Sequence, residues 1–141
     1  MLFFQTLSTL KTGSPEASSD APSAEAKLAA ARVFIRAHVT LCRALCARGE
    51  YEPAAASADA ALERCGEIPN GATLDDQSPR TLEVFTLDAL ADLQEAQGKH
   101  KEATETLMHM WEVEEARHGS SSAVLIPLHI RLARVFLSAD D

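Results

Sequence analysis

The chain has 141 residues, of which 46% are hydrophobic and only 5% aromatic, and its formal net charge is −8. This length predicts one domain, and the Ala- and Leu-rich composition with few Val, Ile and Tyr residues argues against a β-sandwich or barrel. The acidic balance argues against a nucleic-acid backbone or an anionic membrane as the main partner.

The first 23 residues are predicted to lie outside the domain, which spans residues 24–141. Residues 1–11 are apolar, and residues 12–23 form a Ser- and Pro-rich linker. The large apolar side chains near the N-terminus form one stripe if the segment is helical: Phe3, Phe4, Leu7 and Leu10. Because such a stripe is adhesive in water, we expect it to dock on the domain or on a neighbouring molecule.

The same segment has some features of a mitochondrial presequence, but it has no Arg and no basic region ahead of the apolar stretch. A cytoplasmic location is therefore favoured over a mitochondrial one. The three cysteines show no CxxC spacing, which agrees with a reducing, intracellular compartment. No apolar run approaches the roughly 20 residues of a membrane span.

Apolar residues recur at helical spacing along the domain. The first predicted helix, residues 24–48, has Ser23 as its N-cap and ends at Gly49. The second spans about residues 53–65, with Pro53 in its first turn, where proline is tolerated.

Three more helices follow. The third is predicted to begin at Ser78-Pro79 and to run to Gln97, and the fourth spans residues 101–118. A Ser-rich turn leads to the fifth, in which Pro127 either begins the helix or kinks it. No segment has a convincing strand pattern, so the predicted fold class is all-α with about five helices.

A short phrase occurs twice in the chain. Residues 47–54 read ARGEYEPA, and residues 96–103, 49 positions later, read AQGKHKEA. In each phrase a Gly between two helices is followed by a ring and then an Ala, which is typical of helix pairs in repeat arrays. Residues 89–119, ALADLQEAQGKHKEATETLMHMWEVEEARHG, resemble a tetratricopeptide repeat, most closely the long-loop type found in kinesin light chains.

The resemblance implies a superhelix of antiparallel helix pairs. The family's packing and turn positions are occupied in the second unit by Leu90, Ala91, Gly98, His100 and Ala103. Cys42 occupies the position equivalent to Ala91 in the first unit, 49 residues earlier. Ala133 occupies this position in the last unit, 42 residues later. The seven extra residues fall in the predicted loop at 66–77. The match implies two full repeats followed by one helix that caps the array.

In this family the first helix of each pair lines a concave groove that binds a peptide or a helix. The resemblance places ten side chains in this groove: Arg36, Val39, Arg43, Phe85, Asp88, Asp92, Glu95, Ile130, Arg134 and Leu137. The three acidic residues would then lie between two basic strips and fit a basic or amphipathic segment of a protein partner. The alternative is that these charges only solvate the helix surface. The groove lacks the Lys and Asn residues with which chaperone-binding members clamp a carboxylate, so that role is rejected.

No catalytic, cofactor or metal site is predicted. His38, Cys42 and Cys46 share one helix face, as zinc ligands can, but no fourth ligand is evident, and core packing is favoured. No phosphate-binding loop or Ser nucleophile motif appears. Trp111 is expected to fill space between helices rather than to bind a ligand.

Two functions remain open from the sequence. The first is a non-enzymatic protein-interaction scaffold or adaptor that binds a partner's peptide or helix in the groove. The second is a structural subunit of a larger assembly, docked through its N-terminal segment and convex face, with self-association as one form.

Overall fold

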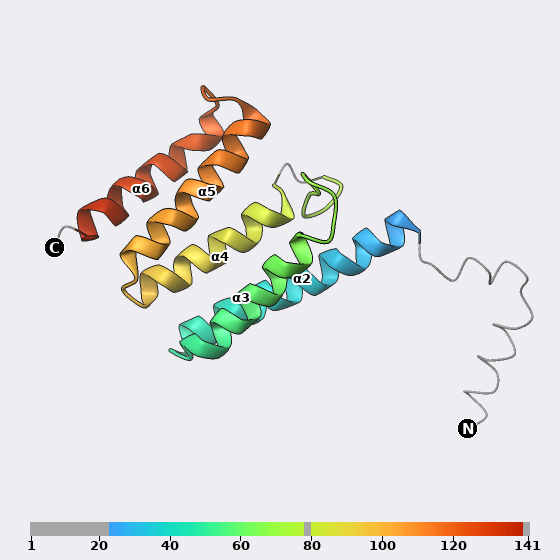
Figure 1. The fold of residues 1–141 in the computed structure, drawn as a ribbon, viewed down its shortest axis with the longest axis horizontal. Coiled ribbons are helices and arrows are strands. Elements are labelled where there is room, and N and C mark those ends of the chain that lie inside the picture. Colours follow the sequence, from blue (N-terminus) through green and yellow to red (C-terminus); the bar gives the residue numbers. More distant parts are fainter. Residues whose placement is uncertain (1–22, 78–79, 140–141) are drawn as a thin grey trace, which may run out of the picture.

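The computed structural model describes residues 23–77 and 80–139. It contains the α-helices α2 (Ala24–Ala47), α3 (Tyr51–Cys65), α4 (Leu82–Ala96), α5 (His100–His118) and α6 (Ile126–Ala139), with a short 3₁₀ helix, η2 (Ala123–Leu125), before α6. The helices stack in a row, with α2 and α3 at one end and α6 at the other (Figure 1). Over these ranges the only β feature is an isolated bridge between Thr73 and Thr81. The predicted all-α class is confirmed.

The repeated phrase marks two copies of one turn. Gly49 and Gly98 have φ angles of 78° and 75°, a left-handed conformation that favours glycine. After each glycine, the next backbone N–H reaches back to the end of the preceding helix: Glu50 N donates to Leu45 O at 2.9 Å, and Lys99 N to Gln94 O at 2.8 Å. This backbone bond is that of a Schellman cap, and it closes α2 and α4 in the same way.

Helix starts follow local capping. Ser23 Oγ accepts from Ala26 N at 3.1 Å, as expected for an N-cap. The third helix starts later than predicted, at Leu82, because Thr81 Oγ1 accepts from Val84 N at 3.1 Å and serves as its cap. The predicted cap at Ser78-Pro79 lies outside the described residues. Pro127 falls in the first turn of α6 and so begins the helix rather than kinking it.

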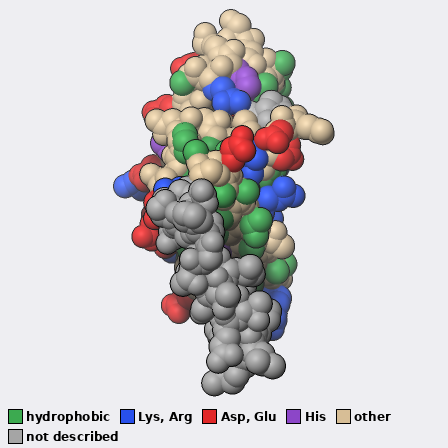
Figure 2. All heavy atoms as spheres, turned by 90° about the vertical axis from the view of Figure 1, so that its right-hand side faces the viewer, with side chains coloured by type: hydrophobic (Ala, Val, Ile, Leu, Met, Phe, Trp, Pro, Cys, Tyr) green, Lys and Arg blue, Asp and Glu red, His purple; other side chains and the backbone are tan. Residues whose placement is uncertain are grey.

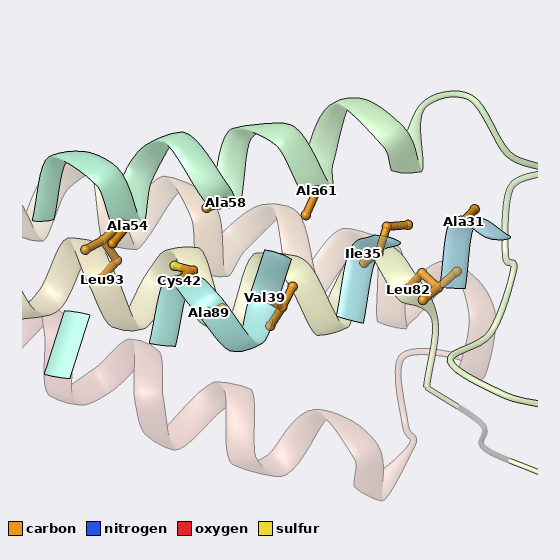
Figure 3. Close-up of a cluster of buried hydrophobic side chains, with 10 residues drawn as sticks. All are labelled: Ala31, Ile35, Val39, Cys42, Ala54, Ala58, Ala61, Leu82, Ala89 and Leu93. Carbon is orange, nitrogen blue, oxygen red and sulfur yellow. The ribbon is translucent and has the colours of Figure 1, made fainter. Parts of the chain in front are cut away.

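The first hydrophobic core joins α2, α3 and α4 (Figure 3). The methyl groups of Ala54, Ala58 and Ala61 on α3 are fully buried, which lets α3 approach its neighbours closely. Val39 also belongs to this core, with only 1% of its surface exposed, so its predicted place in a binding groove was wrong. The reason is its register: Val39 continues the buried stripe of Ile35 on α2.

The second core joins α4, α5 and α6. Val84, Leu87 and Ala91 of α4 pack in one cluster with α5 and with the buried face of α6, whose side chains are Leu128, Leu132 and Val135. Thus α6 covers the side of α5 that α4 leaves free, as expected of a terminal helix. No helix in the described ranges is long and apolar enough to cross a membrane.

Candidate interaction surface

Charged side chains from three helices meet beside α4. Arg43 of α2 contacts Asp92 at 2.7 Å and Asp88 at 3.0 Å, and Arg80 contacts Asp88 at 2.9 Å. Arg131 of α6 hydrogen-bonds to Glu95 through Nε at 3.0 Å and also binds Asp88 and Asp92. We call these six residues the ion network.

The network brings together four of the predicted groove residues, Arg43, Asp88, Asp92 and Glu95, and adds two that sequence reasoning missed. The predicted repeat placed Ile130 in the groove. The next residue, Arg131, lies about 100° further around the helix, and it is this residue that reaches the carboxylates. The signal available in the sequence was charge: Arg131 adjoins the projected position and has the sign that three carboxylates require.

Protonation in the network follows from this pairing. Burial alone would raise the pKa of Asp88, but hydrogen bonds and charge from Arg80 and Arg131 outweigh burial and hold its pKa below the usual value. Burial would likewise lower the pKa values of Arg43 and Arg131, but Asp92 and Asp88 outweigh it and raise both. Asp88, Arg43 and Arg131 are therefore charged at neutral pH.

The network has three carboxylates and three guanidinium groups, so the acidic strip is neutralised by residues of the chain itself. Because Asp88, Asp92 and Glu95 are already paired within the chain, they no longer favour a basic partner. On the face shown in Figure 2, acidic and basic side chains also lie close together rather than in separate patches. Two predicted groove residues, Arg36 and Arg134, are exposed and have no ion pair within the described ranges.

Phe85 is half-buried, with the Arg80 guanidinium 5.8 Å from its ring centroid. Ile130 and Leu137 are exposed but lie on another side of α6 from Arg131. Phe3, Phe4, Leu7 and Leu10, the predicted docking stripe, lie outside the described residues.

An apolar surface runs along α6, formed by Ile126, Ile130, Ala133, Phe136 and Leu137. We call this surface the open face of α6. Ile130 is 57% exposed and Leu137 68% exposed, and all five residues are exposed. Four of the five recur at spacings of four, three and four, so they form one stripe along the helix. The opposite side of α6 is the one packed on α5.

Several cysteine and histidine side chains make packing or polar contacts within the fold. Cys42 is buried in the first core, as predicted, and burial raises the pKa values of the Cys42 and Cys65 thiols, which disfavours the reactive thiolate. The His38 ring lies 4.3 Å from Phe34, and the His109 Nε2 lies 3.2 Å from Glu83, an acid partner that the sequence did not suggest. Among the described residues no three His, Cys, Asp or Glu side chains are grouped as metal ligands would be.

Trp111 fills space between the last two helices, as expected. Its ring meets the His129 ring of α6 edge-on at 3.9 Å, and its Nε1 donates to Glu115 at 3.1 Å. The tryptophan is half-buried and contributes to holding α6 on α5.

Comparison with protein-family models, with curated proteins and with solved structures found no match for this chain. The resemblance to tetratricopeptide repeats therefore stays a prediction.

Proposed function

We propose that this protein is a non-enzymatic interaction module that binds an amphipathic helix of another protein across the open face of α6. The observation that carries the proposal is an array of helix hairpins whose last helix exposes an apolar stripe.

The internal repeat suggests what kind of molecule covers this stripe. Val84, Leu87 and Ala91 on α4 pack in the cluster that contains α5, the second helix of the hairpin. The residues 42 positions later are Ile126, His129 and Ala133 on α6, of which Ile126 and Ala133 belong to the open face. Because Val84 and Ala91 of α4, the positions equivalent to Ile126 and Ala133, are covered by a helix, a helix is the natural occupant of this part of the open face.

The chemistry of the open face supports the same proposal. The open face has four large apolar side chains, and contiguous exposed apolar surface is typical of interaction sites. The small Ala133 in its middle allows close approach of a helix backbone, as Ala91 does between α4 and α5.

The test is to capture binding proteins with the intact chain, with Ile130→Glu and with Met108→Glu. Met108 is a matched control because it is 50% exposed but lies on α5. We expect the intact chain to capture a partner that Ile130→Glu no longer captures, since a charge placed in an apolar contact must be desolvated. The partner should be retained by Met108→Glu, and in the purified complex it should slow hydrogen exchange along residues 126–137. A partner retained equally by Ile130→Glu, with no protection of α6, would refute the proposed site.

One observation favours the second function, a structural subunit of an assembly. The outer side of α2 also carries an exposed stripe at helical spacing: Ala26, Ala30, Val33, Ala37 and Leu41. Both ends of the helix row are therefore apolar, as expected of a unit that stacks between neighbours.

A further inference from the structure

A pocket of about 310 Å³ lies between the start of α4, the second half of α5 and the start of α6. This volume is at the lower end of the range of about 300–1,000 Å³ for small-ligand sites. Half of its lining is apolar: Val84, Met110, Val124, Pro127 and Leu128. The other half is polar: Arg80, Asp88, Glu114, His118 and Arg131.

Glu114 is the unusual residue of this pocket. It is only 6% exposed, and its Oε1 is buried with no hydrogen-bond partner among the described residues. The nearest cationic candidate, His118 Nε2, lies 3.8 Å from Oε2, which is too long for a hydrogen bond. A buried carboxylate oxygen without a hydrogen-bond donor is unfavourable. A ligand that supplies such a donor would therefore bind here favourably.

The other charged groups of the pocket are engaged elsewhere. Arg131 binds the three carboxylates of the ion network, and Arg80 contacts Asp88. Glu114 has only His118 near it, at 3.8 Å, and receives no hydrogen bond on Oε1 from the described residues, so a matching ligand is a cation. The apolar half of the lining suits an alkyl chain attached to that cation.

We propose that this pocket binds an aliphatic ammonium group, which donates a hydrogen bond to the Glu114 carboxylate while its methylene groups pack on Val84, Met110 and Leu128. The ammonium belongs either to a lysine side chain of a bound protein or to a free alkylamine, since both offer the same chemistry. The pocket uses Val124 of η2 and Leu128 and Arg131 of α6. None of these residues belongs to the open face, so this proposal and the proposed function stand or fall separately.

The test follows the methionine methyl signals of ¹³C-labelled protein by NMR. Met110 lines the pocket, whereas Met108 is exposed on the same helix and serves as an internal reference. The probes are n-butylammonium and its neutral counterpart n-butanol, then Nα-acetyl-lysine methylamide and its neutral counterpart Nα-acetyl-norleucine methylamide. We expect a saturable shift of Met110 alone, with the charged member of each pair binding at least about ten-fold more tightly.

Two variants assign the effect to Glu114. Glu114→Gln should weaken ammonium binding about ten-fold or more, because it removes the charge with little change in shape. Glu112→Gln makes the same change on an exposed residue of α5 and should leave binding unchanged. If the lysine derivative binds more tightly than butylammonium, the ligand is a protein side chain. If butylammonium binds more tightly, the ligand is a free amine. Equal binding of neutral and charged probes, or a shift that never saturates, would overturn the proposal without any variant.

Discussion

Arg131 organises the surface that joins the last helix to the rest of the array. Its side chain is 14% exposed, and its guanidinium contacts Asp88, Asp92 and Glu95. Charge pairs this shielded from water are screened less by salt than exposed pairs. Removing the shared cation leaves three carboxylates close together, which is more unfavourable than losing one surface ion pair.

We therefore predict that Arg131→Met lowers the free energy of unfolding by about 1–3 kcal/mol at neutral pH. Methionine keeps an apolar stem but removes the charge, and urea unfolding followed by circular dichroism measures the change. Arg134→Met is the matched control, because Arg134 is exposed on the same helix, and it should stay within about 0.5 kcal/mol. Equal losses in the two variants would mean that the ion network does not stabilise the fold.

The effect of Arg131→Met should also depend on pH. The folded-state pKa of Asp88 lies below its usual value of 3.8, so ionised Asp88 stabilises the fold above that pH. This stabilisation is lost as the pH falls through the folded-state pKa, because the protonated carboxyl no longer pairs with Arg131. The difference in unfolding free energy between the wild type and Arg131→Met should therefore shrink below about pH 3.8.

At the scale of elements, the features that could be predicted from sequence are those determined locally. The glycine turns at Gly49 and Gly98 require a left-handed residue, and Ser23 is a local cap, so both could be recognised from short patterns. The N-cap of α4 at Thr81 was missed because Ser-Pro is also a good helix start, and only the folded loop decides between the two. The ion network was missed in part because Arg43 and Asp88 are 45 residues apart, and their contact depends on how the helices pack.

The predicted repeat allows the same substitution to be compared at matching positions of two helices, α4 and α6. The predicted repeat aligns Ala91 of α4 with Ala133 of α6, but Ala91 is fully buried and Ala133 is exposed. Ala91→Leu should lower the free energy of unfolding by about 1–3 kcal/mol, because a larger side chain forces α4 and α5 apart. Ala133→Leu should change it by less than about 0.5 kcal/mol. Thermal and urea unfolding of both variants test this, and an equally large loss at Ala133 would contradict the open face of α6.

At the scale of the whole molecule, the two ends of the helix row differ in shape. The outer stripe of α2 consists mainly of alanine, with Val33 and Leu41, whereas the open face of α6 has large side chains. If both faces contacted other copies, the contacts would be head-to-tail, and such contacts build rings or open chains rather than simple two-fold dimers. The N-terminal stripe of Phe3, Phe4, Leu7 and Leu10 is a further apolar element that the sequence predicts to dock.

The last prediction separates a stacking subunit from an adaptor. We expect the intact chain to self-associate as its concentration rises, and the chain lacking residues 1–22 to remain a monomer, because the N-terminal stripe would supply an apolar contact between copies. Size-exclusion chromatography with light scattering measures both masses, and circular dichroism confirms that the shortened chain keeps its helices. If both chains are monomers of equal thermal stability, the N-terminal segment makes no such contact, and the structural-subunit function loses its support. The open face of α6 would then be left to a helix of a different protein, which the capture experiment with Ile130→Glu addresses directly.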